Sequence, residues 1–351
     1  TYISAKLFLN LVGGLFIGSS FWGQGDKTSS ASLQNKLFAT FMSLVLSTSL
    51  SQQLQPEFIN QRNLFEVRER PSKLYSWVVF LLSQAIVEIP WNLFGGTLFW
   101  IPWYYMAQFG RESSRAGFSW GMYMIFQIYF ASFAQAVATV APNAMIASVL
   151  FSTLFSFVMV FCGVIQPPRQ LPYFWREWMF YLSPFTWLIE SMMGNFIHDK
   201  VVRCLPDELN DVPTPPGTSC EQHMDFTVSL SRADQSPLDG SLPGFGYYVA
   251  GQNGSCQFCS MRKGEDYLAS IKLKSENRFR DIGFMFAYIV FNYLLYVGLY
   301  YLMRVHNWKS LSRMKQSRPQ PSAEKENFSQ QKEGLETKHL STSEKEATPS
   351  P

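Results

Sequence analysis

One stretch of the chain, residues 116–168, contains no Asp, Glu, Lys or Arg. About 18 uncharged, mostly apolar residues already suffice to cross a bilayer as a helix, and a run as long as this one does not fit a soluble core helix. We therefore expect this part of the chain to lie in a membrane.

Length and the exclusion of charge predict six transmembrane helices, and hence an all-α polytopic membrane protein. The six spans are Ile3–Trp22, Leu33–Ser51, Trp77–Met106, Phe118–Ala141, Ala144–Ile165 and Ile282–Met303. The third would be about 45 Å long as a straight helix, against a hydrocarbon core of about 30 Å, so it must tilt, kink or emerge. Pro90 offers a point for a kink.

A charged segment, residues 54–74, separates the second and third predicted spans, and we call it the elbow. Its ionised and amide side chains are too many for hydrocarbon, so we expect the elbow to face water. Lys and Arg are frequent in the elbow and again after the last span. Positive residues in short loops favour the cytosol, so the elbow and both termini are expected there.

With residues 1–165 forming five spans and residues 281–303 the sixth, residues 166–280 fall outside. Residues 172–199 are apolar but broken at Ser183-Pro184 into pieces too short to cross a bilayer, which predicts a re-entrant helical hairpin. Residues 200–280 are richer in Pro, Gly, Ser, Asp and Cys and predict a small extracellular cap. Residues 304–351 are expected to form a cytosolic, largely disordered tail.

Four of the five cysteines, Cys204, Cys220, Cys256 and Cys259, belong to the predicted cap. An even number on the oxidising side predicts two disulfides, with a zinc site as the alternative because Cys256 and Cys259 have ligand spacing. Since these two are close together, each is expected to pair with Cys204 or Cys220, and we favour the nested pairs Cys204–Cys259 and Cys220–Cys256 over the crossed ones. Asn253 begins an N-glycosylation sequon in the same segment.

Glu88 is the one ionisable residue of the third predicted span. A charge in the membrane is costly and faces a partner or water. Two interpretations are open: a structural ion pair with an arginine of the elbow near the inner surface, or a direct role in transport.

Small residues recur at helical spacing in two spans. Gly14 and Gly18 form a Gly-x-x-x-Gly pattern, which favours close helix packing. Ser148, Ser152 and Ser156 repeat every four residues, and for them packing and ligand binding are both open. Methionines and phenylalanines decorate the same span, and soft apolar groups with small hydroxyls suit varied amphipathic ligands.

Several classes of function are disfavoured. The net charge of +3 is too small, and the basic residues too scattered, for nucleic-acid binding. The chain has no phosphate-binding loop, since Gly25-Asp26-Lys27-Thr28 lacks the glycine before lysine, and its four histidines are dispersed. We expect no catalytic residues, no bound metal and no bound cofactor in this chain.

The run from Gln61 to Trp77, followed by Val87-Glu88-Ile89-Pro90-Trp91, resembles the second membrane domain of fungal pleiotropic drug resistance transporters, the full-size ABCG-type ABC exporters. Phe161–Pro168, Tyr181–Trp187 and the four cap cysteines agree with this resemblance. Members of that family carry two nucleotide-binding domains and two membrane domains, so the resemblance implies that this chain is a fragment. ATP and Mg would then belong to the missing nucleotide-binding domains.

The resemblance implies an ATP-driven efflux pump of the plasma membrane that exports amphipathic drugs, working with those domains and with the first membrane domain. It implies that the elbow transmits nucleotide-driven motion, and that the second and fifth spans line the drug cleft. The coupling candidates are Glu57, Arg62, Arg68, Glu69 and Arg70; the lining candidates are Met42, Leu46, Ser49, Ser152, Ser156 and Met159; the external constriction would be formed by Val164 and Ile165.

Three other functions remain as alternatives. A lipid or sterol exporter would have the same fold, because its cargo needs an apolar cleft too. A non-transporting membrane receptor or scaffold fits less well, since the elbow is charged and no soluble signalling domain is present. An intramembrane enzyme is disfavoured because no span holds paired carboxylates, a histidine cluster or an activated serine.

Overall fold

The computed structural model describes residues 2–213, 247–250, 255–259, 261 and 263–306. The chain divides into two units, residues 1–299 and 300–351. In the second unit the described residues are the last residue of α11 and a π-helical turn, Tyr301–His306.

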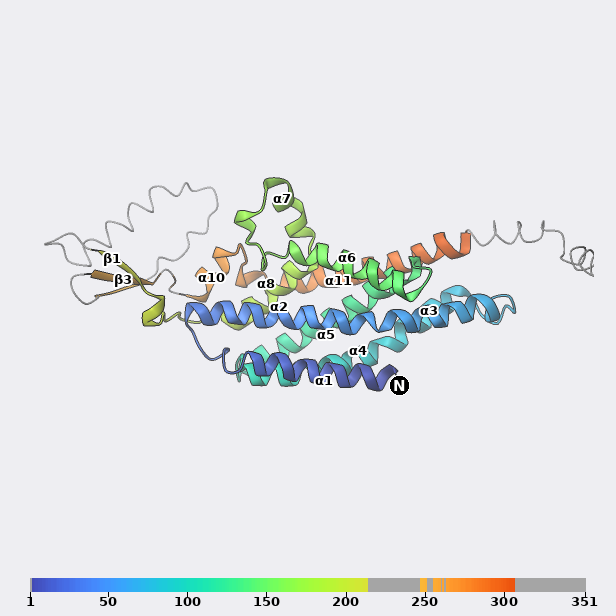
Figure 1. Cartoon of the computed structure of the whole chain (residues 1–351), viewed down its shortest axis with the longest axis horizontal. Helices are drawn as coiled ribbons and strands as arrows, with labels where there is room; N and C mark the ends of the chain where they lie inside the picture. The colour runs from blue at the N-terminus through green and yellow to red at the C-terminus, as the bar shows by residue number, and fades with distance from the viewer. Residues whose placement is uncertain (1, 214–246, 251–254, 260, 262, 307–351) are drawn as a thin grey trace, which may run out of the picture. The chain divides into compact units, whose positions relative to one another are not determined.

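The first unit is a bundle of helices (Figure 1). Its α-helices are α1 (Tyr2–Ser20), α2 (Ser30–Gln52), α3 (Leu54–Leu64), α4 (Trp77–Ala107), α5 (Ser113–Val140), α6 (Ala144–Val160), α7 (Tyr173–Leu182), α8 (Pro184–Ile197), α10 (Gly264–Ser270) and α11 (Arg278–Tyr300). Shorter helical turns are the π-helix η1 (Phe65–Glu69) and the 3-10 turns η2 (Pro168–Gln170), η3 (Pro206–Glu208) and η5 (Ser275–Asn277).

Among the described residues, four helical segments are long and apolar enough to cross a membrane: Tyr2–Ser20, Trp77–Ala107, Ser113–Val140 and Ser275–His306. They correspond to the first, third, fourth and sixth predicted spans. The third runs without interruption through Pro90 and Pro102 over 31 residues, about 46 Å, so the surplus length that the sequence predicted is present.

The other two predicted spans are also helices, but one is not apolar enough and the other is not long enough to count among the four. The second, α2, is long enough, but polar residues such as Gln34, Asn35 and Lys36 lower its hydropathy. The fifth, α6, has only 17 residues and ends at Val160 rather than Ile165. Gly163, three residues further on, has a φ of +84°, which is incompatible with a right-handed helix. Glycine adopts this conformation readily because it has no side chain.

Helices α1 and α4 lie side by side (Figure 1). A Cβ added to Gly14 would come within 2.4 Å of the Phe99 carbonyl oxygen, and one added to Gly18 within 2.8 Å of the Pro102 carbonyl oxygen. The Gly-x-x-x-Gly pattern therefore serves close helix packing, as the sequence predicts.

The loops of the bundle meet in two groups. Gly25 N–H donates to the Ala107 carbonyl (2.8 Å), Arg203 N–H to the Thr28 carbonyl (3.1 Å) and Arg115 Nη1 to the His198 carbonyl (3.2 Å), so the loops after α1, α4 and α8 are tied together. The elbow instead meets the turn between α5 and α6, through Arg62. The elbow therefore contacts a different set of turns from the loops that follow α1, α4 and α8.

The expectation of an all-α fold needs a correction. Residues of the predicted cap form a three-stranded antiparallel sheet in the order β1-β3-β2, from β1 (Asn210–Pro213), β2 (Tyr247–Ala250) and β3 (Ser255–Cys259). The strands have only four or five residues each, too short for their pattern to stand out among the surrounding turn residues.

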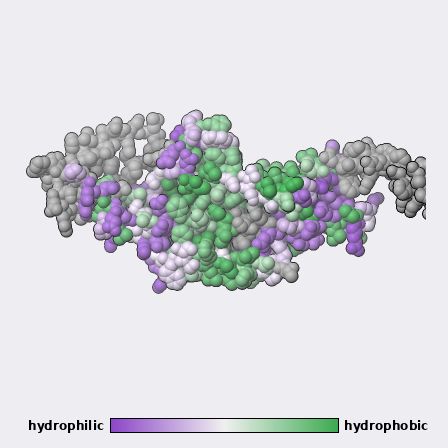
Figure 2. Space-filling model, in the orientation of Figure 1, coloured by the Kyte–Doolittle hydropathy of each residue, from purple (hydrophilic) through white to green (hydrophobic). Residues whose placement is uncertain are grey.

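On the face shown in Figure 2, hydrophobic residues gather over the middle of the bundle and hydrophilic ones toward its two ends. Exposed large apolar side chains on the long helices include Phe16 (67 %), Leu82 (57 %) and Leu294 (67 %). A broad exposed apolar surface marks a contact with lipid or with another protein.

Candidate functional site

The elbow is a continuation of α2 rather than a separate loop. After Gln53 the chain is helical again through α3 and η1, and only residues 70–76 leave the helix. One face of α3 is buried, and its residues follow helical spacing: Leu54, Phe58, Ile59 and Arg62. Phe65 then stacks on Phe80 with ring centroids 4.6 Å apart, which fixes the elbow against the start of α4.

Arg62 is the most enclosed of the predicted coupling residues, with none of its surface exposed. Its Nη1 donates to the carbonyls of Ala138 and Ala141, both at 2.8 Å, and Nη2 donates to that of Pro142 at 3.3 Å. These carbonyls belong to the C-terminal end of α5 and the turn after it, where a cation complements the helix dipole. Arg62 thus holds α3 to α5 and offers no surface to a soluble partner.

The other four coupling candidates reach the surface. Arg68 is exposed, while Glu57, Glu69 and Arg70 are half-buried. Tyr75 donates its hydroxyl to Glu69 Oε2. Burial, this hydrogen bond and the charge of Glu69 raise the pKa of Tyr75 to about 12, so the hydroxyl stays a donor at neutral pH.

Apolar side chains accompany these charges on the elbow. Leu64, Val67 and Leu74 are 46 %, 79 % and 69 % exposed. Exposed apolar residues among charged ones are typical of a surface that binds another protein.

Glu88 has a partner that the sequence did not indicate. Its Oε2 lies 2.8 Å from Nζ of Lys6, and its Oε1 accepts from the Tyr2 hydroxyl at 3.4 Å. Both charged side chains are largely buried between α1 and α4. The expected pair with an arginine of the elbow is therefore wrong, because Glu88 pairs with Lys6 of the neighbouring helix. A structural role for Glu88 stays a prediction.

The three lining candidates on α2 differ in their surroundings. Met42 is 44 % exposed. Leu46 packs toward α1, since a Cβ on Gly13 would meet its Cδ2 at 2.8 Å. The side chain of Ser49 lies outside the described part of the chain.

Helix α6 has two different flanks beside its buried stripe of Ala147, Phe151 and Phe155. At 100° per residue, one flank carries Ser148, Ser152, Ser156 and Met159, which we call the hydroxyl flank. The opposite side carries Ile146, Leu150, Leu154 and Phe157, which we call the aliphatic flank and which is 39–47 % exposed. Ser156 is exposed, and Ser152 and Met159 are partly buried.

The two constriction candidates follow α6 in the turn around Gly163. Val164 packs partly against the apolar core, and Ile165 is 52 % exposed. Helices α7 and α8 then follow, divided at Ser183 as predicted, and Ser183 Oγ donates to the Val158 carbonyl of α6 at 3.1 Å. Apart from Trp187, every residue of α8 is buried.

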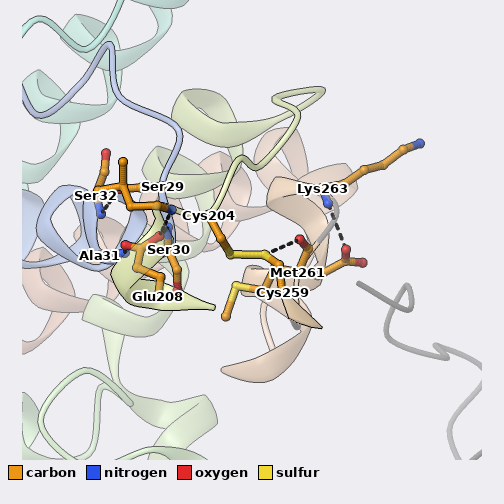
Figure 3. The surroundings of a disulfide bond; sticks show 11 residues. Ser29, Ser30, Ala31, Ser32, Cys204, Glu208, Cys259, Met261 and Lys263 are labelled. Carbon is orange, nitrogen blue, oxygen red and sulfur yellow. Dashed lines mark hydrogen bonds between the residues drawn. A yellow bond between two sulfur atoms is a disulfide. The ribbon is translucent and has the colours of Figure 1, made fainter. Parts of the chain in front are cut away.

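The predicted cap is fixed to the bundle beside α2 (Figure 3). Cys204 and Cys259 form a disulfide, which is one of the two nested pairs. Cys220, the side chain of Cys256 and Asn253 lie outside the described residues, so the second pair and the sequon stay predictions.

Glu208 is a residue of this region that the sequence did not single out. Its carboxylate accepts from the N–H groups of Ala31 (2.8 Å), Ser30 (3.1 Å) and Leu205 (3.0 Å), and so caps the N-terminus of α2. Burial alone would raise the pKa of Glu208, but these N–H groups outweigh it and hold the pKa below its usual range.

Within the described residues, one group of possible metal ligands comes together. His198 Nδ1 lies 3.2 Å from Glu265 Oε1, and His198 Nε2 lies 3.1 Å from Asp199 Oδ2. Both ring nitrogens already face carboxylates, so these three side chains are accounted for by contacts with one another between the end of α8 and α10.

The arrangement is that of a polytopic helical membrane domain. The profile of the ABC-2 type transporter family matches residues 1–197, and the chain belongs to this family. It is 39 % identical over 312 residues to the Brefeldin A resistance protein of Schizosaccharomyces pombe, covering 88 % of this chain and 20 % of that protein.

Two further relatives are named as multidrug transporters. The chain is 36 % identical over 315 residues to the ABC multidrug transporter atrA of Aspergillus oryzae, covering 90 % of this chain and 20 % of the relative. It is 36 % identical over 334 residues to the ABC multidrug transporter AFR2 of Cryptococcus neoformans, covering 93 % of this chain and 21 % of the relative. The chain thus spans about a fifth of the length of these proteins.

Proposed function

We propose that this chain is the membrane-spanning half of an ATP-driven pump that exports amphipathic drugs across the plasma membrane. The observation that carries the proposal is the match of nearly the whole chain to a relative named for brefeldin A resistance and to relatives named as multidrug transporters. ATP and Mg would be bound by nucleotide-binding domains elsewhere in the complete transporter, and the first membrane domain would supply the other half of the drug cleft.

The elbow is proposed to receive the motion of a nucleotide-binding domain. Arg68 and the half-buried Glu69 and Arg70 offer charges, and Leu64 and Val67 offer apolar contacts. Because α3 continues α2 and is held to α5 by Arg62, a push on the elbow would move both helices as one body.

The hydroxyl flank of α6 and Met42 of α2 are proposed to line the cleft. Serine hydroxyls and methionine beside aromatic residues can orient varied ligands, while apolar burial at about 25 cal/mol per Å² supplies most of the affinity. The aliphatic flank of α6 would face lipid. Val164 and Ile165 would narrow the external end of the path.

The test is drug efflux by the complete transporter in cells that lack other pumps, with brefeldin A and an amphipathic fluorescent dye as probes. We expect efflux that stops when ATP is depleted. Arg68→Ala should lower efflux while ATP hydrolysis and surface expression persist, whereas an equal loss of expression would mean that Arg68 only folds the elbow. Export of labelled phospholipid or sterol without export of either probe would overturn the drug assignment in favour of the lipid exporter.

A further inference from the structure

Two carboxylates are buried together where α8 meets the start of α11. Glu190 of α8 is 4 % exposed and Asp281, in the first turn of α11, is 0 % exposed. Ser191 Oγ donates to the Arg278 carbonyl at 3.0 Å, so the two helices are in direct contact at this point. The pair therefore lies inside a helix junction and not on an open surface.

Glu190 is well supplied with donors. The N–H of Lys274 and the amide Nδ2 of Asn277 each donate to its Oε1 at 2.9 Å, and Arg280 Nη2 lies 3.5 Å from its Oε2. Both carboxylate oxygens of Glu190 therefore have donors within reach.

Asp281 accepts hydrogen bonds on only one of its two carboxylate oxygens, among the described residues. Arg280 Nε and Nη2 donate to its Oδ1 at 3.2 and 3.1 Å, whereas its Oδ2 is buried without a hydrogen-bond partner. Among the described residues, the charged groups facing Asp281 are Glu190 from α8 and Arg280 from its own helix.

One guanidinium serves both carboxylates. Arg280 lies over the rings of Trp187 and Phe284, with its Cζ at 5.2 and 5.4 Å from their centroids, so it is held in place. With both acids ionised, the pair would keep one uncompensated negative charge out of water. A buried group in that position takes up a proton rather than remain charged.

We infer that Glu190 and Asp281 form a proton-binding site, with the proton on Oδ2 of Asp281 at neutral pH. Release of the proton to water leaves two facing carboxylates, and their repulsion loosens the junction of α8 and α11. The state of the site would couple the packing of α7 and α8 to pH on their side of the membrane. This inference concerns the chain itself and holds whatever the transporter carries.

The first test is an infrared pH titration of the complete transporter, reading the C=O stretch of a protonated carboxyl. We expect such a signal at neutral pH in the native protein and its loss in Asp281→Asn. Glu190→Gln removes the facing charge, so the Asp281 signal should then disappear at a lower pH than in the native protein. Glu276→Gln, an exposed carboxylate of the same segment, should leave the signal unchanged.

A second measurement is the thermal stability of the same variants between pH 6 and pH 8. The native protein should lose stability as the pH rises, because its folded state binds a proton that the unfolded chain has released. Asp281→Asn imitates the neutral acid, so it should be folded and lack this slope. The inference is overturned if the carboxyl signal at neutral pH survives in Asp281→Asn, or if the slope in that variant equals the native one.

Discussion

At the scale of single residues, the buried arginine of the elbow shows how a charge can be structural in a segment whose other charges face water. Replacing Arg62 with Leu would remove the guanidinium donor of the buried Ala138 and Ala141 carbonyls, and the loss of a buried hydrogen bond costs about 1–3 kcal/mol. We expect the melting temperature of the complete transporter in detergent to fall sharply. Arg68→Ala, the exposed control, should melt like the native protein; equal melting of both variants would contradict the structural role of Arg62.

Glu208 provides a prediction on pH. Its pKa is held below the usual range by N–H groups of α2 and of its own turn, so it stabilises the fold above the ordinary carboxyl pKa, and that contribution is lost as the pH falls through the lowered value. Glu208→Gln should therefore melt earlier than the native protein at neutral pH, and the difference should vanish in acid. The neighbouring exposed carboxylate in Asp207→Asn serves as control and should show no pH-dependent difference.

At the scale of elements, α1 and α4 are joined by close glycine contacts and by the pair of Lys6 and Glu88. Removing one partner leaves a buried unpaired charge, which costs about 3–5 kcal/mol, whereas replacing both with apolar residues is much milder. We expect Glu88→Leu to unfold earlier than the double variant Lys6→Met, Glu88→Leu. A double variant as unstable as the sum of the two single variants would show that the two side chains do not interact.

Helix α6 carries the prediction on cargo. Ser156→Phe places bulk on the hydroxyl flank, so it should change the rank order of exported compounds while ATP hydrolysis continues. Leu154→Phe places the same bulk on the aliphatic flank, nearly opposite on the helix, and should leave the ranking unchanged. The measurement is the efflux of each compound of a panel by both variants. If Ser156→Phe lowered the efflux of every compound in parallel, or if Leu154→Phe changed the rank order equally, the assignment of the lining would be contradicted.

The sequence predicted these elements unevenly. Long apolar helices such as α4 and α5 were predicted because charge exclusion over tens of residues has no other explanation. Helix α6 was predicted too long because no polar residue marks its end at Val160, and the apolar run continues past the turn at Gly163 to Ile165. Arg62 was grouped with the exposed arginines, although its spacing from Phe58 and Ile59 places it on the buried face. The Lys6 partner of Glu88 and the capping role of Glu208 depend on contacts between distant segments, which a single sequence does not show.

At the scale of the whole molecule, the chain has one membrane domain and about a fifth of the length of its relatives. We propose that other domains of the complete transporter cover the elbow and the hydroxyl flank of α6. We propose that this domain carries drugs when ATP is hydrolysed elsewhere in the same transporter.

The most direct measurement is the uptake of brefeldin A into inside-out plasma-membrane vesicles that contain the complete transporter. We predict uptake with ATP and Mg, and none with a non-hydrolysable ATP analogue or without Mg. Vesicles without the transporter provide the background. Uptake that is equal with and without hydrolysable ATP, or that does not exceed this background for brefeldin A and for a panel of other amphipathic drugs, would contradict the account.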